Sequence, residues 1–233
     1  MRRFAPFFAL AAAMVMGSVA FAQADLTNSP HDLSSASTAD IKTAGTDQLC
    51  AFCHTPHMAN APTYGPLWNR NYTPPVGMQT YADAASPTFQ GGAIALGPQS
   101  YACLSCHDGS VALDNLANVP GSGMGAQPAG YTFTDPNTVL VTNQITNGAA
   151  AIGTDLSNDH PVGFSFDTSD AADPGIQAVA SVPADLVFYG ATNQVECATC
   201  HNVHDWDGPT NAYTMFLRRP TAASQICRDC HLK

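Results

Sequence analysis

Apolar and polar residues alternate over several short stretches in the middle of this chain. Alternation with a period of two places every second side chain on one face of a β-strand. The stretches contain Tyr131 and Phe133, then Val139 and Val141 after the turn sequence Asp135-Pro136-Asn137, then Phe164 and Phe166, and then the run Leu186 to Tyr189. They predict a few short strands.

Apolar residues at helical spacing are scarce in the rest of the chain. The 233 residues include 18 Gly and 17 Pro, which interrupt regular structure throughout. We therefore expect a fold that is mostly irregular coil, with short helices mainly at the cysteine pairs described below.

The longest apolar run lies at the N-terminus, from Phe4 to Val19. It follows the basic pair Arg2-Arg3 and precedes the small-residue sequence Ala20-Phe21-Ala22, the pattern of a secretory signal peptide. We predict cleavage after residue 22, or after residue 24 at a second acceptable sequence. The run is shorter than the roughly 18 to 20 residues that span a bilayer, and no later segment could span one. We therefore expect a secreted protein, extracellular or at the cell surface, with the periplasm as the alternative.

The charge of the chain limits the classes of molecule that it can bind. The formal net charge is −10, and it becomes −12 once Arg2 and Arg3 are removed. An acidic chain of this kind is a poor partner for nucleic acid. Only 11% of the residues are charged, against about 25% in an ordinary soluble domain. This indicates either a solvent-exposed surface with few charges or a surface that is covered by other copies of the chain.

All eight cysteines occur in pairs, and a histidine follows each pair directly. The four C-x-x-C-H motifs are Cys50 to His54, Cys103 to His107, Cys197 to His201 and Cys227 to His231. They divide residues 23–233, which we expect to form one domain, into an N-terminal cluster (about 31–107), a β-containing insert (about 108–196) and a C-terminal cluster (about 197–231).

The C-x-x-C-H spacing is typical of covalent haem attachment. One helical turn sets the two thiols against the two vinyl groups of a haem, and the following histidine becomes the proximal iron ligand. Zinc sites, disulfides and a thioredoxin-like pair also use paired cysteines. None of these alternatives requires a histidine at the fifth position of all four motifs. We therefore predict four haem c groups, with His54, His107, His201 and His231 as proximal ligands.

Four histidines remain outside the motifs, and four irons need a second ligand. These residues are His31, His57, His160 and His204. The matching number predicts two imidazoles at every haem. Methionine is the alternative second ligand, but with four histidines to spare we expect the methionines to pack against the porphyrins; they are Met58, Met78, Met124 and Met215.

Two of the spare histidines follow a proximal ligand by three residues: His57 after His54, and His204 after His201. Residues three apart share one face of a helix, whereas a second ligand must reach the iron from the opposite side of the haem. Neither His57 nor His204 can therefore bind the same iron as its neighbour. Each must reach a different haem and so hold two haems close together.

The segments 50–57, 101–108, 160–164, 197–204 and 227–233 resemble the multihaem cytochromes with doubled CXXCH motifs. In haem number, chain length and motif order, the chain is most similar to filament-forming extracellular tetrahaem cytochromes, the OmcE-type cytochrome nanowires. The resemblance implies sparse secondary structure organised around four stacked haems. It also implies a homopolymer joined end to end, in which the neighbouring subunit donates one ligand from the position that matches His57.

We expect the following ligand assignments from chain proximity, from the three-residue spacing and from the resemblance. His31 ligates the first haem, His204 a haem of the N-terminal cluster, and His160 the second or third. His57 ligates the fourth haem, held by Cys227 and Cys230, of the next copy.

Three functions fit these features. The first is an extracellular electron conduit that passes electrons between redox partner proteins or extracellular acceptors. The second is a soluble periplasmic tetrahaem shuttle. The third is a reductase, which would need an open iron position that four spare histidines do not leave, so we expect an electron carrier rather than an enzyme.

Overall fold

Short helices occupy the cysteine pairs, as the sequence predicts. The computed structural model describes residues 26–59, 64–84, 86–121, 130–206 and 214–232. The predicted signal peptide and Met124 lie outside these residues. The four motifs fall on the 3₁₀ helix η1 (Leu49–Phe52), on α1 (Pro98–His107), on α3 (Cys197–Cys200) and on α4 (Gln225–Arg228).

The strands are two residues long and form three small antiparallel sheets. β1 (Lys42–Thr43) pairs with β3 (Phe133–Thr134), and β4 (Leu140–Val141) pairs with β5 (Gln144–Ile145). A three-stranded sheet has the order β2-β6-β7 and consists of Gly92–Ala93, Phe164–Ser165 and Gln194–Val195. Because β3 and β6 pair with strands of the N-terminal cluster, the insert is part of the same fold as the residues before it.

Three of the four predicted stretches contain or adjoin a strand, and the fourth does not form one. The alternation at 131–133 and 139–141 coincides with β3 and β4. At Phe164 the strand ends after one more residue, because Ser165 caps α2 (Phe166–Ala172) by accepting a hydrogen bond from the Thr168 N–H. The run 186–189 is not a strand. Only Tyr189 of this run forms a bridge, to Gln194.

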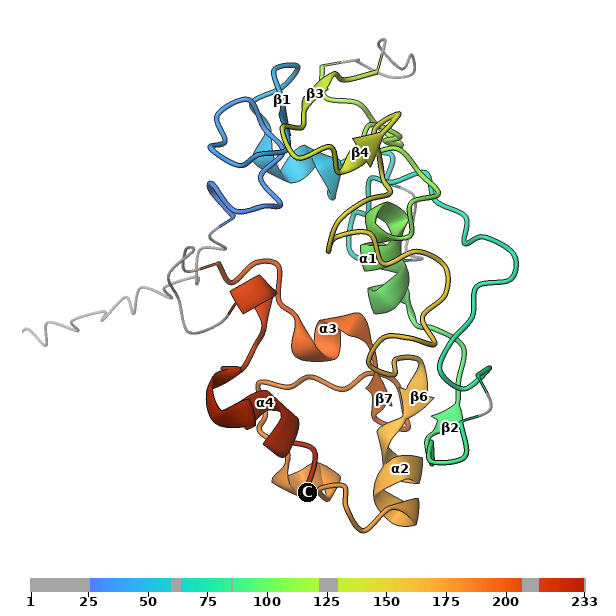
Figure 1. Cartoon of the computed structure of the whole chain (residues 1–233). Coiled ribbons are helices and arrows are strands. Elements are labelled where there is room, and N and C mark those ends of the chain that lie inside the picture. Colours follow the sequence, from blue (N-terminus) through green and yellow to red (C-terminus); the bar gives the residue numbers. More distant parts are fainter. Residues whose placement is uncertain (1–25, 60–63, 85, 122–129, 207–213, 233) are drawn as a thin grey trace, which may run out of the picture.

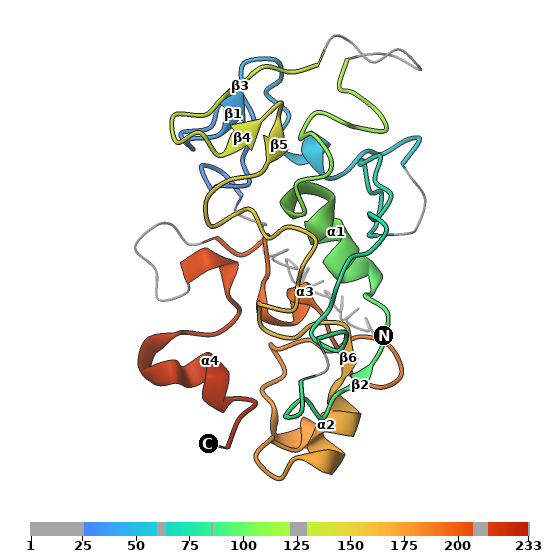
Figure 2. The ribbon, with the colours of Figure 1, turned by 45° about the vertical axis from the view of Figure 1, so that its right-hand side comes forward.

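The remaining helical turns are short 3₁₀ segments: η2 (Val179–Ser181), η3 (Thr214–Phe216) and η4 (Ala222–Ser224). In Figures 1 and 2, β1, β3 and β4 lie at one end of the molecule and α2 at the other, with α1 and α3 between them. The helices of the described part of the chain all lack the length and apolarity needed to cross a membrane.

The apolar interior is divided into three small clusters. One surrounds Leu104 of α1, one surrounds Phe52 and Leu116, and one surrounds Phe164 and Phe166. Each of the first three motif helices adjoins one of these clusters or a buried polar group, so the motifs sit on fixed supports. The fourth motif also adjoins a cluster, since Cys230 packs against the one around Phe164 and Phe166, and the ion pairs described below hold it as well.

Candidate haem sites

Each motif closes one turn of helix from its first cysteine. The His54 N–H donates to the Cys50 carbonyl at 2.8 Å, and the His231 N–H donates to the Cys227 carbonyl at 2.8 Å. The His201 N–H makes the same bond to the Cys197 carbonyl at 3.1 Å. This turn brings the two thiols and the histidine of a motif to one local site. All eight thiols are free, so the disulfide alternative is wrong for this structure.

Three motif histidines are oriented through their Nδ1 atoms. Nδ1 of His54 lies 2.8 Å from the Pro66 carbonyl, Nδ1 of His107 lies 2.7 Å from the Ala150 carbonyl, and Nδ1 of His201 lies 2.8 Å from the Met215 carbonyl. Because a carbonyl oxygen only accepts, Nδ1 carries the hydrogen in each ring. Nε2 is then the nitrogen with a free lone pair, the usual arrangement of a metal-binding histidine whose other nitrogen is held by the backbone.

Three of the motif histidines face a spare histidine. Ring centroids are 6.1 Å apart for His54 and His204, 5.9 Å for His107 and His31, and 6.4 Å for His231 and His160. The partners are far apart in sequence, so the tertiary fold brings them together.

These distances fit two imidazoles on opposite sides of one metal. With a metal–nitrogen bond of about 2.0 Å, the centroids of two such rings lie about 6 Å apart. Two imidazoles that held one metal could take any angle between their planes, so the observed angles of 25°, 65° and 74° do not exclude such a site. The residues present therefore fit haem held by two histidines at three of the four motifs.

The His31 ring supports this fit in a second way. Its Nδ1 is buried and has no hydrogen-bond partner among the described residues. Burial, followed by the nearby His107 ring, lowers the pKa of His31 to about 4. Burial also lowers the pKa values of His107 and His204. Neutral imidazole is the form that binds a metal.

The remaining two histidines are His57 and His201. The His57 side chain is exposed, and no ring of the described residues pairs with it or with His201. The motif of His201 is otherwise formed like the others, with its Nδ1 bonded to a carbonyl. The third motif thus has an oriented histidine ring, and His57 is the spare histidine that faces no motif histidine within the described residues.

Two spare histidines lie beside other motifs than we expected. His31 lies beside His107 of the second motif rather than beside the first motif, and it also packs on Phe216 with ring centroids 4.6 Å apart. His160 lies beside the fourth motif and not the second or third. His204 lies beside His54 of the N-terminal cluster, and which haem each of these histidines binds stays a prediction.

The four motifs form a connected series in space. The Cys103 and Cys197 thiols share a hydrogen bond, which raises the pKa of Cys103 and lowers that of Cys197. Burial raises the pKa of Cys53 to about 12, and the neighbouring Cys106 thiol adds to that rise. Burial raises the pKa of Cys230 to about 11, with a further contribution from Cys200. Motifs one and two, two and three, and three and four are therefore neighbours.

The methionines take different places. Met78 packs against the Leu104 cluster, in keeping with a packing role. Met58 and Met215 are 60% and 66% exposed, and their packing against porphyrins stays a prediction. The backbone carbonyl of Met215 instead orients His201.

A buried arginine supports the second motif. Arg70 is fully buried, and its guanidinium donates to the Ser105 carbonyl at 3.0 Å, to the Ala112 carbonyl at 2.8 Å and to the Leu113 carbonyl. These bonds fix the C-terminal half of α1, which carries Cys106 and His107. This role could not be predicted from the sequence, because nothing in the residues around an isolated arginine indicates that it is buried.

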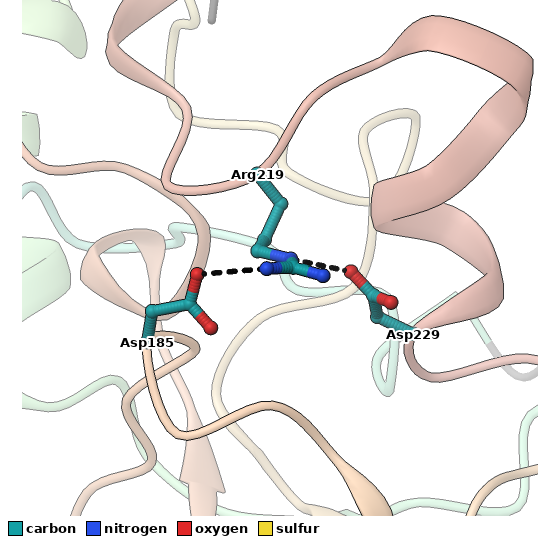
Figure 3. A network of polar contacts seen from close by, with 3 residues as sticks. All are labelled: Asp185, Arg219 and Asp229. Atoms are coloured by element: carbon teal, nitrogen blue, oxygen red, sulfur yellow. Dashed lines mark hydrogen bonds and ion pairs between the residues drawn. The ribbon is translucent and has the colours of Figure 1, made fainter.

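The fourth motif is held by Arg219 (Figure 3). Its guanidinium lies 2.8 Å from Asp229, between the two cysteines of the motif, and 3.2 Å from Asp185 of the insert. The arginine therefore ties α4 to the residues that precede β7.

We expect Arg219→Gln to reduce the free energy of unfolding by at most about 1 kcal/mol, because both ion pairs reach the surface, where solvent and salt weaken them. Denaturant unfolding at low and high salt measures this, and the difference should shrink at high salt. Arg228→Gln is the control, since Arg228 is exposed on the same helix. Equal effects of the two variants would contradict the role of Arg219.

Comparison with known proteins gives no relative: no protein-family model matches the chain, and no curated protein matches it.

Proposed function

We propose that the chain is an electron-transfer protein that carries four covalently attached haem c groups, each between two histidines. The observation that carries the proposal is the set of three histidine ring pairs at 5.9–6.4 Å, each joining a C-x-x-C-H motif to one spare histidine. When bound, haem iron supplies reversible one-electron chemistry. The cysteines hold the group in place, and the paired imidazoles keep other molecules from its iron.

The residue roles follow from this arrangement. The eight motif cysteines form the thioether attachments. His54, His107, His201 and His231 are the proximal ligands, with Nδ1 of the first three fixed by a backbone carbonyl. His204, His31 and His160 are the second ligands of the first, second and fourth haems. With these positions filled, the protein carries electrons and does not act on a substrate at the metal.

Neighbouring motifs support electron passage along the whole chain. The thiols of consecutive motifs lie close enough to shift one another's pKa, and His204 lies three residues after His201 while facing His54. The polypeptide therefore brings the first three attachment sites together and joins the fourth to the third.

We further propose that the subunit polymerises end to end outside the cell, with His57 of one copy completing the third haem of the next. This differs from our expectation of the fourth haem. Support comes from the contrast between three histidine pairs already at ligand spacing and an exposed His57 without a ring partner among the described residues. The alternative is a soluble periplasmic shuttle, in which His57 binds the third haem of its own chain.

Intact-protein mass spectrometry tests the haem assignment. We expect a mass equal to the mature chain plus four haems, because all four motifs are complete and all eight thiols are free. The absorption spectrum should be that of low-spin haem with two imidazoles. A protein expressed with a haem-attachment system that carries three haems or fewer, or carries zinc or disulfides instead, would contradict the proposal.

A further inference from the structure

Glu196 is the only glutamate among the 18 acidic residues of the chain, and it is 1% exposed. It directly precedes Cys197 and caps α3, where its own N–H donates to the Thr199 hydroxyl at 3.0 Å. A buried carboxylate is costly unless donors or charges compensate it. Its position at an attachment cysteine therefore calls for an explanation.

The carboxylate joins the second motif helix to the third. One oxygen accepts the Gly97 N–H at 2.9 Å, and the other accepts the Ser100 hydroxyl, both at the start of α1. The Ser100 oxygen in turn accepts the Cys197 N–H at 3.0 Å. Cys103 of α1 and Cys197 of α3 share a thiol hydrogen bond. Glu196 thus lies at the junction of the second and third attachment sites.

The packing around the carboxylate is close. A Cβ atom on Gly97 would lie 2.8 Å from one carboxylate oxygen, closer than real Cβ contacts allow. Glycine at this position lets the backbone approach the carboxylate and donate to it. The contact also shuts that side of the group from water, so the charge state of Glu196 responds to nearby charges with little screening.

The surrounding groups leave the negative charge weakly compensated. Tyr101 and Tyr189 lie near Glu196, and burial raises the pKa of each, so both are neutral. Arg218, a cation of this group, is engaged with Tyr189 and donates to the Ala198 carbonyl at 2.9 Å. No ion pair to Glu196 is found within the described residues. The Cys103 and Cys197 thiols become uncharged thioethers once haem is attached.

Burial raises the pKa of the Glu196 carboxyl above its ordinary value, while the donors from Ser100 and Gly97 oppose the rise. A nearby group that gains one negative charge would raise it further, by like-charge repulsion. Reduction of a haem adds one such charge.

We propose that Glu196 takes up one proton when the second or third haem is reduced, which makes electron transfer at this junction proton-coupled. The inference rests on the proposed function. One electron from a one-electron donor converts ferric to ferrous haem, and one proton from water converts the Glu196 carboxylate to the carboxylic acid. Release of the electron and the proton reverses the step. Because linkage is reciprocal, protonation of Glu196 also makes reduction of the neighbouring haem more favourable.

Redox titration of the haem-loaded protein at a series of pH values tests this, with dithionite as the reductant. Below the pKa of Glu196 in the oxidised protein, the potential of the coupled haem should not depend on pH. Above it the potential should fall as pH rises, and it should level off above the pKa of the reduced protein. We expect the proton affinity of Glu196 to be at least tenfold higher in the reduced protein than in the oxidised protein. This corresponds to a change of about 59 mV in the reduction potential of a one-electron couple.

Glu196→Gln keeps the shape and the acceptor oxygen but cannot titrate. It should abolish this pH dependence and leave the potential above that of wild type at high pH. Redox-difference infrared spectroscopy should show loss of a carboxylic acid band that forms on reduction. Asp83→Asn is the matched control, since Asp83 is an exposed carboxylate held only by Thr80; it should keep the wild-type behaviour.

Ser100→Ala provides a second variant, which retains Glu196 and removes one donor. It should shift the pH-dependent range upward, because the ionised carboxylate loses a hydrogen bond. Unchanged pH dependence in both Glu196→Gln and Ser100→Ala, in proteins whose mass shows four haems, would overturn the proton-coupling inference alone. A mass without four haems would instead overturn the proposed function.

Discussion

Replacing His31 with Ala is expected to turn one of the four haems high-spin, and that haem is the one at the second motif. The His31 ring lies 5.9 Å from His107, at the spacing of two imidazoles on one metal. Alanine supplies no ligand, and the neighbouring Phe216 ring cannot replace it. Electron paramagnetic resonance should show about one quarter of the iron as high-spin, and this fraction should bind carbon monoxide.

The affected haem can be identified by removing single attachment sites. In a Cys103→Ala, Cys106→Ala background the second haem is lost, so adding His31→Ala should create no new high-spin iron. In a Cys50→Ala, Cys53→Ala background the second haem remains, and His31→Ala should still turn it high-spin. The reverse pattern would show that His31 serves the first haem, the assignment that chain proximity suggested.

Local features of the fold were predictable from the sequence. A C-x-x-C-H motif carries its own reason for a helical turn, so the positions of η1, α1, α3 and α4 followed from the cysteines. The alternation near Phe133 and Val141 likewise located two strands. These predictions needed only neighbouring residues, and the short-range backbone bonds of each motif agree with them.

The pairing of histidines was less predictable, because it depends on contacts between distant segments. His31 precedes the first motif in sequence but packs on Phe216 near the C-terminus, and nothing in the residues around His31 indicates that contact. The three-residue spacing did exclude His54 as a partner of His57, and His201 as a partner of His204. It left three haems open to each of the two histidines.

The groups that orient the motif histidines could not be read from the sequence. The acceptors at Pro66, Ala150 and Met215 are backbone carbonyls, which every residue possesses. Their role depends on how a loop returns to its motif. Glu196 did carry a signal, since it is the single glutamate beside an attachment cysteine, but its burial needed the structure.

Replacing His57 with Ala is expected to abolish polymerisation while leaving four haems on each chain. The imidazole is exposed, and the third motif is the one without a facing histidine ring among the described residues. A bond from His57 to the third haem of the next copy would form only in the polymer. Mass spectrometry should still show four haems, light scattering should show a monomer, and one iron in four should be high-spin.

His160→Ala is the matched control, because His160 is also exposed but already faces His231 of its own chain. It should turn one haem high-spin without removing His57 from the interface, so filaments should persist. Negative-stain microscopy distinguishes the two variants directly. If the His57→Ala protein forms filaments with four low-spin haems, the ligand at the interface is a different residue.

Dilution of the wild-type protein decides between the two ways in which His57 can serve the third haem. A ligand donated between copies makes the high-spin fraction rise as filaments dissociate, since mass action removes the donor. A ligand donated within the chain keeps all four haems low-spin at every concentration. The second result, together with a monomeric mass, would favour the soluble shuttle. His57 would then ligate the third haem of its own chain, and no ligand would be shared between subunits.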